Sequence, residues 1–452
     1  MVPASQSDWS CFADGRSGPP TQHDRAMGSV RSQGWVGRRA RDVATFGLGV
    51  LGCVFYTTAS FAEDFHISGF GTVGLAKVDA PVGWGYRRDI SQQIDHNTFR
   101  ADLDSRLGVQ VNYAPSSQFE LVVQAIVSPR TEASETSDSI EWAFAAYRPN
   151  PNWTLRVGRV NLDAFLLSDH LNVGFSYDLA RPPVEFYAQL PSTLDGADLA
   201  RVWNHGGTLW RVKAFAGRTT SISDTDRIEV RPVVGLMASR EAGGLLLRAS
   251  VIRAKLANIP PELQPLLEAL DQFSLLPVPD VAAQASVFRS QLDLAGTPST
   301  YWALGVQYEQ AAWLWSGEFT HVSGISVFSA GYATVGRRFG PVTVFGLASG
   351  VVTSQSTVAT PDWQSELTPL LGPDLAQQAQ QAATFAALAL NSNSTKQRAL
   401  AVGARWDLTG RLALKAQWDH IRTEANGTAL WGGSSLDAAH ANVASVALDF
   451  IF

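Results

Sequence analysis

The segment from Asn161 to Asp198 carries a strong local excess of acidic side chains in this sequence of 452 residues. It holds six carboxylates against one guanidinium: Asp163, Asp169, Asp178, Glu185, Asp195 and Asp198 against Arg181. The stretch Arg181–Glu185 is stiff, because each of its prolines fixes its own φ and restricts the residue before it. In a narrow aqueous space with low-dielectric walls, such carboxylates would concentrate cations. The alternative is that several of them only cap turns or attach the loop to its surroundings.

Other reactive residue types give weaker signals. The histidines show no metal-ligand spacing, among them His170, His321, His420 and His440. The formal net charge of −6 and the pI near 5.8 argue against a nucleic-acid partner, which would require a basic face. We therefore expect no cofactor, no metal site and no nucleic acid.

The first 62 residues have the order of a secretory signal peptide. An apolar run, Val43–Tyr56, precedes the small-residue site Ser60–Ala62 and follows a basic stretch with Arg25, Arg31, Arg38, Arg39 and Arg41. This order predicts that residues 1–62 are removed and that 63–452 form the mature chain. The two alternatives are an uncleaved anchor and lipidation at Cys53. Because Cys11 and Cys53 are the two cysteines, the mature chain would contain no thiol.

The mature part contains no run of about 18 consecutive apolar residues, the length that a transmembrane helix needs. Its apolar residues instead recur at every second position, which indicates strands. In the last strand Val446, Leu448 and Phe450 share one face, and Ser445 and Asp449 lie on the other. We predict sixteen strands, at about 65–78, 103–113, 119–128, 139–148, 153–160, 196–203, 208–218, 230–240, 245–256, 301–309, 313–323, 326–338, 342–354, 397–407, 412–422 and 442–452.

The connections between these strands alternate in length. Short ones contain turn residues, as in 114–117, 149–152, 204–207, 241–244, 310–312, 339–341 and 409–410. Long ones lie between them at about 79–102, 129–138, 161–195, 219–229, 257–300, 355–396 and 423–441, with one exception near Gly324. Short turns on one side and long loops on the other are typical of a transmembrane antiparallel β-barrel in the bacterial outer membrane, with the turns and both termini in the periplasm.

Aromatic residues flank the short turns in pairs: Tyr113 and Phe119, Tyr147 and Trp153, Trp203 and Trp210, and Tyr308 and Trp313. Such rings suit the headgroup level of a membrane, so they predict the periplasmic girdle of a barrel. The alternative is that they are edge aromatics of a soluble sheet.

The two-residue alternation also assigns charges to the inside of the barrel. Seven bases would face inward: Arg106, Arg156, Arg211, Lys213, Arg248, Arg405 and Lys415. Eight acids would join them: Asp104, Glu120, Glu141, Glu309, Glu318, Asp407, Asp419 and Asp449. The predicted wall is therefore mixed in charge, and each base could simply pair with a carboxylate on the neighbouring strand.

At this point the chain resembles the Gram-negative general porin family. The resemblance covers Phe65 to Phe452 and rests on layout, on the opening strand His66–Gly71, on the strand end Leu155–Arg159 before the long third loop, and on the terminal Phe452. The long fifth and seventh loops depart from compact members of that family.

The resemblance implies that the third loop, 161–198, folds into the lumen and narrows it. It also implies a constriction formed by Asp163, Asp169, Asp178, Arg181 and Glu185, opposed by wall bases at Arg106, Arg156, Arg211, Arg405 and Lys415. Three barrels would associate into a homotrimer in the outer-membrane lipid. Phe452 would be part of the signal read by the barrel-assembly machinery.

The segments Pro260–Phe273 and Leu367–Leu390 contain strong helix formers, so we expect short helices over the mouth. We expect a passive, weakly cation-preferring channel for small hydrophilic solutes and ions, and not an enzyme. A channel selective for anions or small organic acids is the main alternative, and an outer-membrane hydrolase is a more distant one. Asp419 and His420 would lie on opposite faces of a strand and so could not act together as a catalytic pair.

Overall fold

The computed structural model describes residues 65–188, 190–223, 226–324, 327–354, 357–392, 394–428, 430–431 and 437–452. The predicted signal peptide, residues 1–62, lies outside the described residues.

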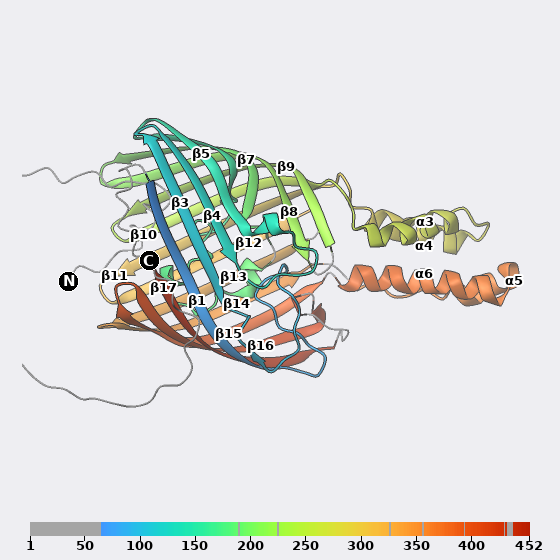
Figure 1. Ribbon diagram of the computed structural model, residues 1–452. Helices are drawn as coiled ribbons and strands as arrows, with labels where there is room; N and C mark the ends of the chain where they lie inside the picture. Colours follow the sequence, from blue (N-terminus) through green and yellow to red (C-terminus); the bar gives the residue numbers. More distant parts are fainter. Residues whose placement is uncertain are drawn as a thin grey trace, which may run out of the picture. The chain divides into compact units, whose positions relative to one another are not determined.

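The described chain forms one closed antiparallel β-barrel (Figure 1). Its sheet has 17 strands, of which β2 (Phe99–Arg100) has only two residues, so sixteen strands build the wall. The wall strands are β1 (Phe65–Asp79), β3 (Arg106–Ser116), β4 (Phe119–Val127), β5 (Ile140–Asn150), β6 (Trp153–Asn161), β7 (Thr193–His205), β8 (Thr208–Ser223), β9 (Asp226–Ala242), β10 (Leu245–Leu256), β11 (Pro298–Gln310), β12 (Trp313–Ser323), β13 (Phe328–Phe339), β14 (Val342–Thr353), β15 (Thr395–Thr409), β16 (Leu412–Thr428) and β17 (Ala439–Ile451). The predicted sixteen-stranded barrel is confirmed.

Closure follows from the pairing of the first and last strands. Each wall strand pairs with the next along the chain, and β17 pairs with β1 from Phe70↔Ile451 to Asp79↔Asn442. The other edge of β1 pairs with β3. Every wall strand therefore has two neighbours, and the sheet has no open edge.

The alternation predicted from the sequence is present in the wall. On β16 and β17 the side chains of Lys415, Asp449 and Ser445 are buried on the inside, whereas Trp418 and Val446 are exposed on the outside. Exposed apolar side chains follow the same rule on the other strands, for example Leu121, Leu304 and Leu400. The outer surface is thus apolar and the inner surface polar, as expected for a wall between lipid and a polar lumen.

The two ends of the barrel differ as predicted. One end has the two-residue turns 117–118, 151–152, 206–207, 243–244, 311–312, 340–341 and 410–411, and longer connections lie at the other end. In the 206–207 turn both glycines have positive φ, +60° and +76°, which suits a tight hairpin. Aromatic rings meet at this end: Phe119 stacks on Tyr147 at 4.8 Å between centroids, and Trp203 stacks on Trp210 at 6.3 Å.

Two of the predicted long connections are wrong. The segment 219–229 is mostly strand, since β8 and β9 stay paired until Ser223↔Asp226. Likewise β16 continues to Thr428, so the last long connection is shorter than 423–441. The first extension is rich in threonine, serine and isoleucine, and the second, 423–428, is mostly polar. Such segments lack the apolar periodicity that marks a strand inside a membrane.

Two long connections carry helices: η4 (Pro261–Leu263), α3 (Gln264–Phe273) and α4 (Pro279–Leu292) follow β10, and α5 (Trp363–Leu371) and α6 (Pro373–Ser392) follow β14. The remaining helices are short: η2 (Thr136–Ser139), η3 (Gly174–Ser176) and α2 (Val184–Tyr187). Among the described residues, none of the helices is long and apolar enough to cross a membrane. The predicted helices near 260–273 and 367–390 are confirmed, but α4 was not predicted.

Helices α3 to α6 share a small apolar core of their own. Trp363 is completely buried in it, with Leu270, Phe288 and Ala383 around it. The Trp363 indole Nε1 donates a hydrogen bond to Gln284 Oε1 at 2.7 Å. The core therefore joins the connection after β10 to the connection after β14. None of its buried members belongs to a wall strand.

We expect Trp363→Ala to unfold this helical bundle and leave the barrel intact. Loss of a buried tryptophan costs about 3–5 kcal/mol, and the bundle core does not include barrel residues. Limited proteolysis should then cut within 257–297 or 357–392, while the heat-induced mobility shift of the barrel on gels stays unchanged. Phe385→Ala is the matched control, because Phe385 is 61% exposed. Equal protease resistance of both variants would contradict a separate core.

Candidate functional site

The connection between β6 and β7, residues 162–192, lies inside the barrel. Short hydrogen bonds tie it to strands distant in the sequence. The Leu166 amide donates to Glu318 on β12 at 2.7 Å, and the Ser250 hydroxyl on β10 donates to the Ala164 carbonyl at 2.8 Å. Farther along, the Ala180 amide donates to Gln417 on β16 at 2.9 Å. The segment, called here the inner loop, therefore crosses the lumen from one side of the wall to the other.

Asp163 attaches the start of the inner loop to the wall. Its carboxylate is fully buried and forms ion pairs with Lys213 on β8, at 2.5 Å, and with Arg248 on β10. Two wall cations thus neutralise one loop anion. The side chain does not face an aqueous space, in contrast to the expectation that Asp163 lines a constriction.

Arg181 attaches the middle of the inner loop to the opposite wall. Its guanidinium donates to both carboxylate oxygens of Asp104, at 3.0 and 2.8 Å, and to the Ser445 hydroxyl at 2.7 Å. Asp419 lies 3.7 Å from the same guanidinium. Burial by itself lowers the pKa of Arg181, but Asp104, Tyr86 and Asp419 together outweigh it, and the pKa lies well above its ordinary value. Arg181 therefore keeps its charge inside the barrel.

The short helix α2 attaches the end of the inner loop. Glu185 is buried and accepts hydrogen bonds from Ser349 Oγ on β14 at 2.9 Å and from Gln397 Nε2 on β15 at 2.6 Å. The hydroxyl of Tyr187 donates to Glu318, which also accepts a hydrogen bond from the Tyr332 hydroxyl at 2.8 Å. The buried carboxylates here act as acceptors for the wall and the loop.

The two other loop acids named from the sequence lie in different surroundings. Asp169 accepts a hydrogen bond from Asn161 Nδ2 at 2.7 Å and lies 3.6 Å from Arg211. Burial raises the pKa of Asp169, but Lys213 and Arg211 together lower it well below its usual range. Asp178 is half-buried and makes no ion pair within 4 Å among the described residues.

Three of the wall bases hold the backbone of the inner loop. Lys415 Nζ donates to the carbonyls of Gly174 and Leu179 at 2.6 and 3.0 Å. Three further contacts of this kind join Arg405 Nη1 to the carbonyls of Phe175 and Tyr177, at 2.8 and 3.0 Å, and Arg106 Nε to the carbonyl of Asn172, at 2.6 Å. These three bases therefore bind loop carbonyls, whereas Lys213, Arg248 and Arg211 lie beside loop carboxylates.

Arg156 binds a carboxylate of the wall itself. Its Nε and Nη2 atoms contact the Asp198 carboxylate at 2.5 to 3.0 Å. Asp198 is the direct register partner of Arg156 on the neighbouring strand β7. This is the cross-strand pairing that was the alternative interpretation of the inward charges.

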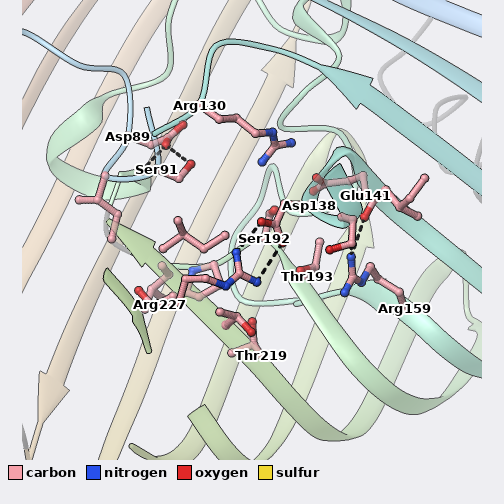
Figure 2. Close-up of a pocket in the computed structure, with 18 of the residues that line it drawn as sticks. Asp89, Ser91, Arg130, Asp138, Glu141, Arg159, Ser192, Thr193, Thr219 and Arg227 are labelled. Carbon is pink, nitrogen blue, oxygen red and sulfur yellow. Dashed lines mark hydrogen bonds and ion pairs between the residues drawn. The ribbon is translucent and has the colours of Figure 1, made fainter. Parts of the chain in front are cut away.

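A polar pocket of about 520 Å³ remains at the end of the barrel that carries the long connections (Figure 2). Its wall comes from the ends of β4 to β9, from the inner loop, and from the connections around 89–91, 128–138 and Asn258. Six acids and four arginines line it: Asp89, Glu135, Asp138, Glu141, Asp195 and Glu229, with Arg130, Arg159, Arg218 and Arg227. We call this space the mouth pocket.

Most charges in the mouth pocket are paired. Arg227 contacts Asp138 at 2.6 Å, and Arg159 contacts Asp195 at 2.7 Å. Arg130 differs, since among the described residues it makes neither an ion pair nor a hydrogen bond, and its Nε is buried. Arg130, Asp138 and Arg227 were not predicted as site residues, because the two-residue alternation assigns only side chains within strands of the membrane region.

The described residues contain no group of three or more histidine, cysteine, aspartate or glutamate side chains that could hold a metal ion. Asp419 faces the lumen and is buried, while His420 lies on the opposite face of β16 and contacts Asn442. The two therefore do not form a catalytic pair, as expected from the strand geometry.

No protein-family model matches the chain, and no curated protein matches it. Solved structures do match its fold. An anion-selective porin from Comamonas acidovorans covers 86% of this chain and 100% of its own, with 12% identity and a TM-score of 0.48. The outer-membrane channel DcaP of Acinetobacter baumannii covers 86% of this chain and 98% of its own, with 13% identity and a TM-score of 0.47. OmpT of Vibrio cholerae covers 87% of this chain and 99% of its own, with 8% identity and a TM-score of 0.47.

The architecture itself identifies the surroundings of the protein. A closed barrel satisfies every backbone hydrogen bond of its wall, and an apolar outer face makes lipid the favourable neighbour of that wall. With sixteen wall strands, an inner loop and unequal connections at its two ends, the chain has a porin-type fold and is a protein of the cell outer membrane.

We expect Asp163→Asn to loosen the inner loop strongly. The variant leaves Lys213 and Arg248 buried without their anion, and breaking such a buried pair costs about 3 kcal/mol. The temperature at which the folded band disappears on gels should fall. Asp178→Asn is the matched control, since it also removes one loop carboxylate but breaks no ion pair. Equal transition temperatures of the two variants would show that Asp163 does not hold the loop.

Proposed function

We propose that the protein is a porin of the Gram-negative general porin kind, a water-filled channel through which small hydrophilic solutes and ions diffuse passively. The observation that carries the proposal is the inner loop, which is fixed across a closed barrel and leaves a charged pocket of about 520 Å³ at the mouth. A channel needs such a polar space inside an apolar wall. In this proposal residues 1–62 are the removed signal peptide, 63–452 the barrel, and 161–198 the constriction.

A weak cation preference follows from the charges at the mouth pocket. Six carboxylates line it against four guanidiniums, and a pocket with low-dielectric walls strengthens the effect of that excess. The buried acids of the inner loop add little, because Asp163 and Asp169 lie beside wall cations. The preference therefore arises at the mouth, and ion pairs such as Arg227 with Asp138 keep it modest.

Arg130 supports the second candidate, a channel selective for anions or small organic acids. Its guanidinium lines the mouth pocket and has no ion pair among the described residues. A carboxylate on a solute could accept two parallel hydrogen bonds from it. The two candidates differ in the sign of the permeant ion, so one measurement separates them.

We expect purified protein in a planar bilayer to give stable conductance steps, in groups of three if the proposed homotrimer forms. A salt gradient should give a reversal potential that favours cations. Glu135→Gln with Glu229→Gln should shift that potential toward anions, most at low salt where screening is weakest. Arg130→Gln should shift it further toward cations.

Glu268→Gln is the control for this experiment, because it removes an exposed carboxylate on α3 that does not line the mouth pocket. A shift of the same size in this control would mean that general surface charge sets the potential. Absence of conductance steps would contradict the channel proposal. The hydrolase alternative would then be tested by assaying the purified protein for hydrolysis of lipid or peptide. A current that saturates with one organic acid, and loses that saturation in Arg130→Gln, would favour the selective channel.

Assembly by the barrel-assembly machinery is part of the proposal, and Phe452 is the residue that this machinery would recognise. Phe452 is 57% exposed, and its amide and carbonyl both hydrogen-bond to Gly69 at 2.9 Å. Its ring lies over Gly69, where any side chain would clash with it. The terminal residue thus takes part in closing the barrel and still presents its ring outward.

We expect Phe452→Ser to lower the amount of folded, heat-modifiable barrel in the membrane. Phe450→Ser is the matched control, because the Phe450 ring covers Gly71 in the same way but does not end the chain. If recognition of the terminal aromatic matters, the loss should be larger for Phe452→Ser at both high and low expression. Equal losses would mean that both rings act only through packing on their glycines.

A further inference from the structure

A row of basic residues crosses the outer surface of three neighbouring strands. Arg398 on β15 is the direct register partner of Arg422 on β16, and Arg422 is the direct partner of His440 on β17. All three side chains are exposed, and 77% of the Arg398 side chain is accessible. We call these three residues the outer row.

The outer row lies at the upper border of the lipid-facing surface. Along the same faces, Leu400, Val402 and Trp418 are exposed apolar residues just below it. On β16 ten residues separate Leu412, beside the two-residue turn, from Arg422. At about 3.3 Å per residue and a tilt of about 40°, this is a rise of about 25 Å, the height of the apolar band of a membrane barrel. The row is therefore level with lipid headgroups at the end that carries the long connections.

The protein supplies too little negative charge to the outer row. Directly opposed residues on antiparallel strands have Cβ atoms about 5 Å apart, and like charges in such a pair repel each other. Among the described residues, Glu424 is the one carboxylate within 4 Å, at 3.9 Å from Arg398 Nη2. Arg422 donates from Nε to His420 Nε2 at 3.4 Å and makes no ion pair among the described residues. Most N–H donors of the two guanidiniums therefore have no acceptor within the described structure and can bind another molecule.

Outward arginines at the opposite end of the barrel have partners within the protein. The Arg337 guanidinium lies over the rings of Trp313 and Phe339, at 5.0 and 5.1 Å from their centroids. Arg201 lies over Trp153 and Trp203 in the same manner, at 5.4 and 5.3 Å. Such cation–π contacts compensate the charge locally. No cation–π contact involves Arg398 or Arg422 in the part of the chain that the structure describes.

We propose that the outer row binds the phosphate headgroup of a lipid in the outer leaflet. Guanidinium groups match phosphate oxygens in a bidentate manner, and two of them on adjacent strands can hold one phosphate between them. The phosphate removes the repulsion between Arg398 and Arg422, and the apolar band below accommodates the acyl chains. A lipid meets both requirements, whereas free phosphate meets only the first. The site faces away from the lumen and so is independent of the channel proposed above.

The test is native mass spectrometry of the full mature barrel in detergent, titrated with lipid A that carries two phosphates. The wild-type protein should retain at least one lipid A molecule after the detergent is removed. Arg398→Gln with Arg422→Gln should weaken this binding at least tenfold, since each guanidinium near a headgroup contributes roughly a tenfold factor or somewhat less. Arg337→Gln is the control: it removes an outward arginine at the opposite end and should leave binding unchanged.

Four further measurements test the interpretation. The same glycolipid without phosphates should bind at least tenfold more weakly to the wild-type protein, and equal binding would overturn the proposal. Inorganic phosphate at equal concentration should not displace lipid A; displacement would identify a site for free phosphate instead. The heat-induced mobility shift and the bilayer conductance of the double variant should match the wild type, which shows that the loss of lipid is not a loss of fold. Unchanged lipid A binding in the folded double variant would also overturn the proposal.

Discussion

Barrel closure is the constraint on which the rest of this structure depends. In lipid no water is available for backbone amides and carbonyls, so every strand of the wall needs a partner on both sides. The pairing of β1 with β17 supplies the last set of these hydrogen bonds, and Phe452 extends it by two bonds to Gly69. Closure also divides the side chains of every strand into an apolar outer set and a polar inner set.

The polar inner set determines how the inner loop is held. Once the loop is enclosed, its charges and carbonyls cannot all reach bulk water, so the wall must satisfy them. Asp163 forms ion pairs with two wall cations, and Arg181 forms one with Asp104. Lys415 donates hydrogen bonds to two loop carbonyls. These contacts come from strands all around the barrel. The inner loop is therefore a fixed part of the interior, and its charges are largely neutralised.

Charges without a full set of partners among the described residues lie on the two surfaces that we propose bind other molecules. In the mouth pocket Arg130 is unpaired within the described structure, beside an excess of carboxylates. On the outside, Arg398 and Arg422 face each other with one nearby carboxylate. In our proposals the first surface binds solutes and the second binds lipid. A mutation in one should leave the other unaffected, because the wall separates them.

The sequence by itself determined the barrel, since a strand facing lipid on one side and a polar lumen on the other repeats every second residue. Val446 and Ser445 illustrate this local rule, and the two-residue turns at 206–207 and 243–244 fix the hairpins. Only the tertiary structure decided which charges meet. Lys213 holds Asp163 across 50 positions of the chain, and the path of the inner loop, which no periodicity encodes, brings the two together. The sequence pattern did not predict helix α4 or the extended pairing of β8 with β9 for the same reason. Their stability comes from packing and pairing with other segments, and not from a local pattern.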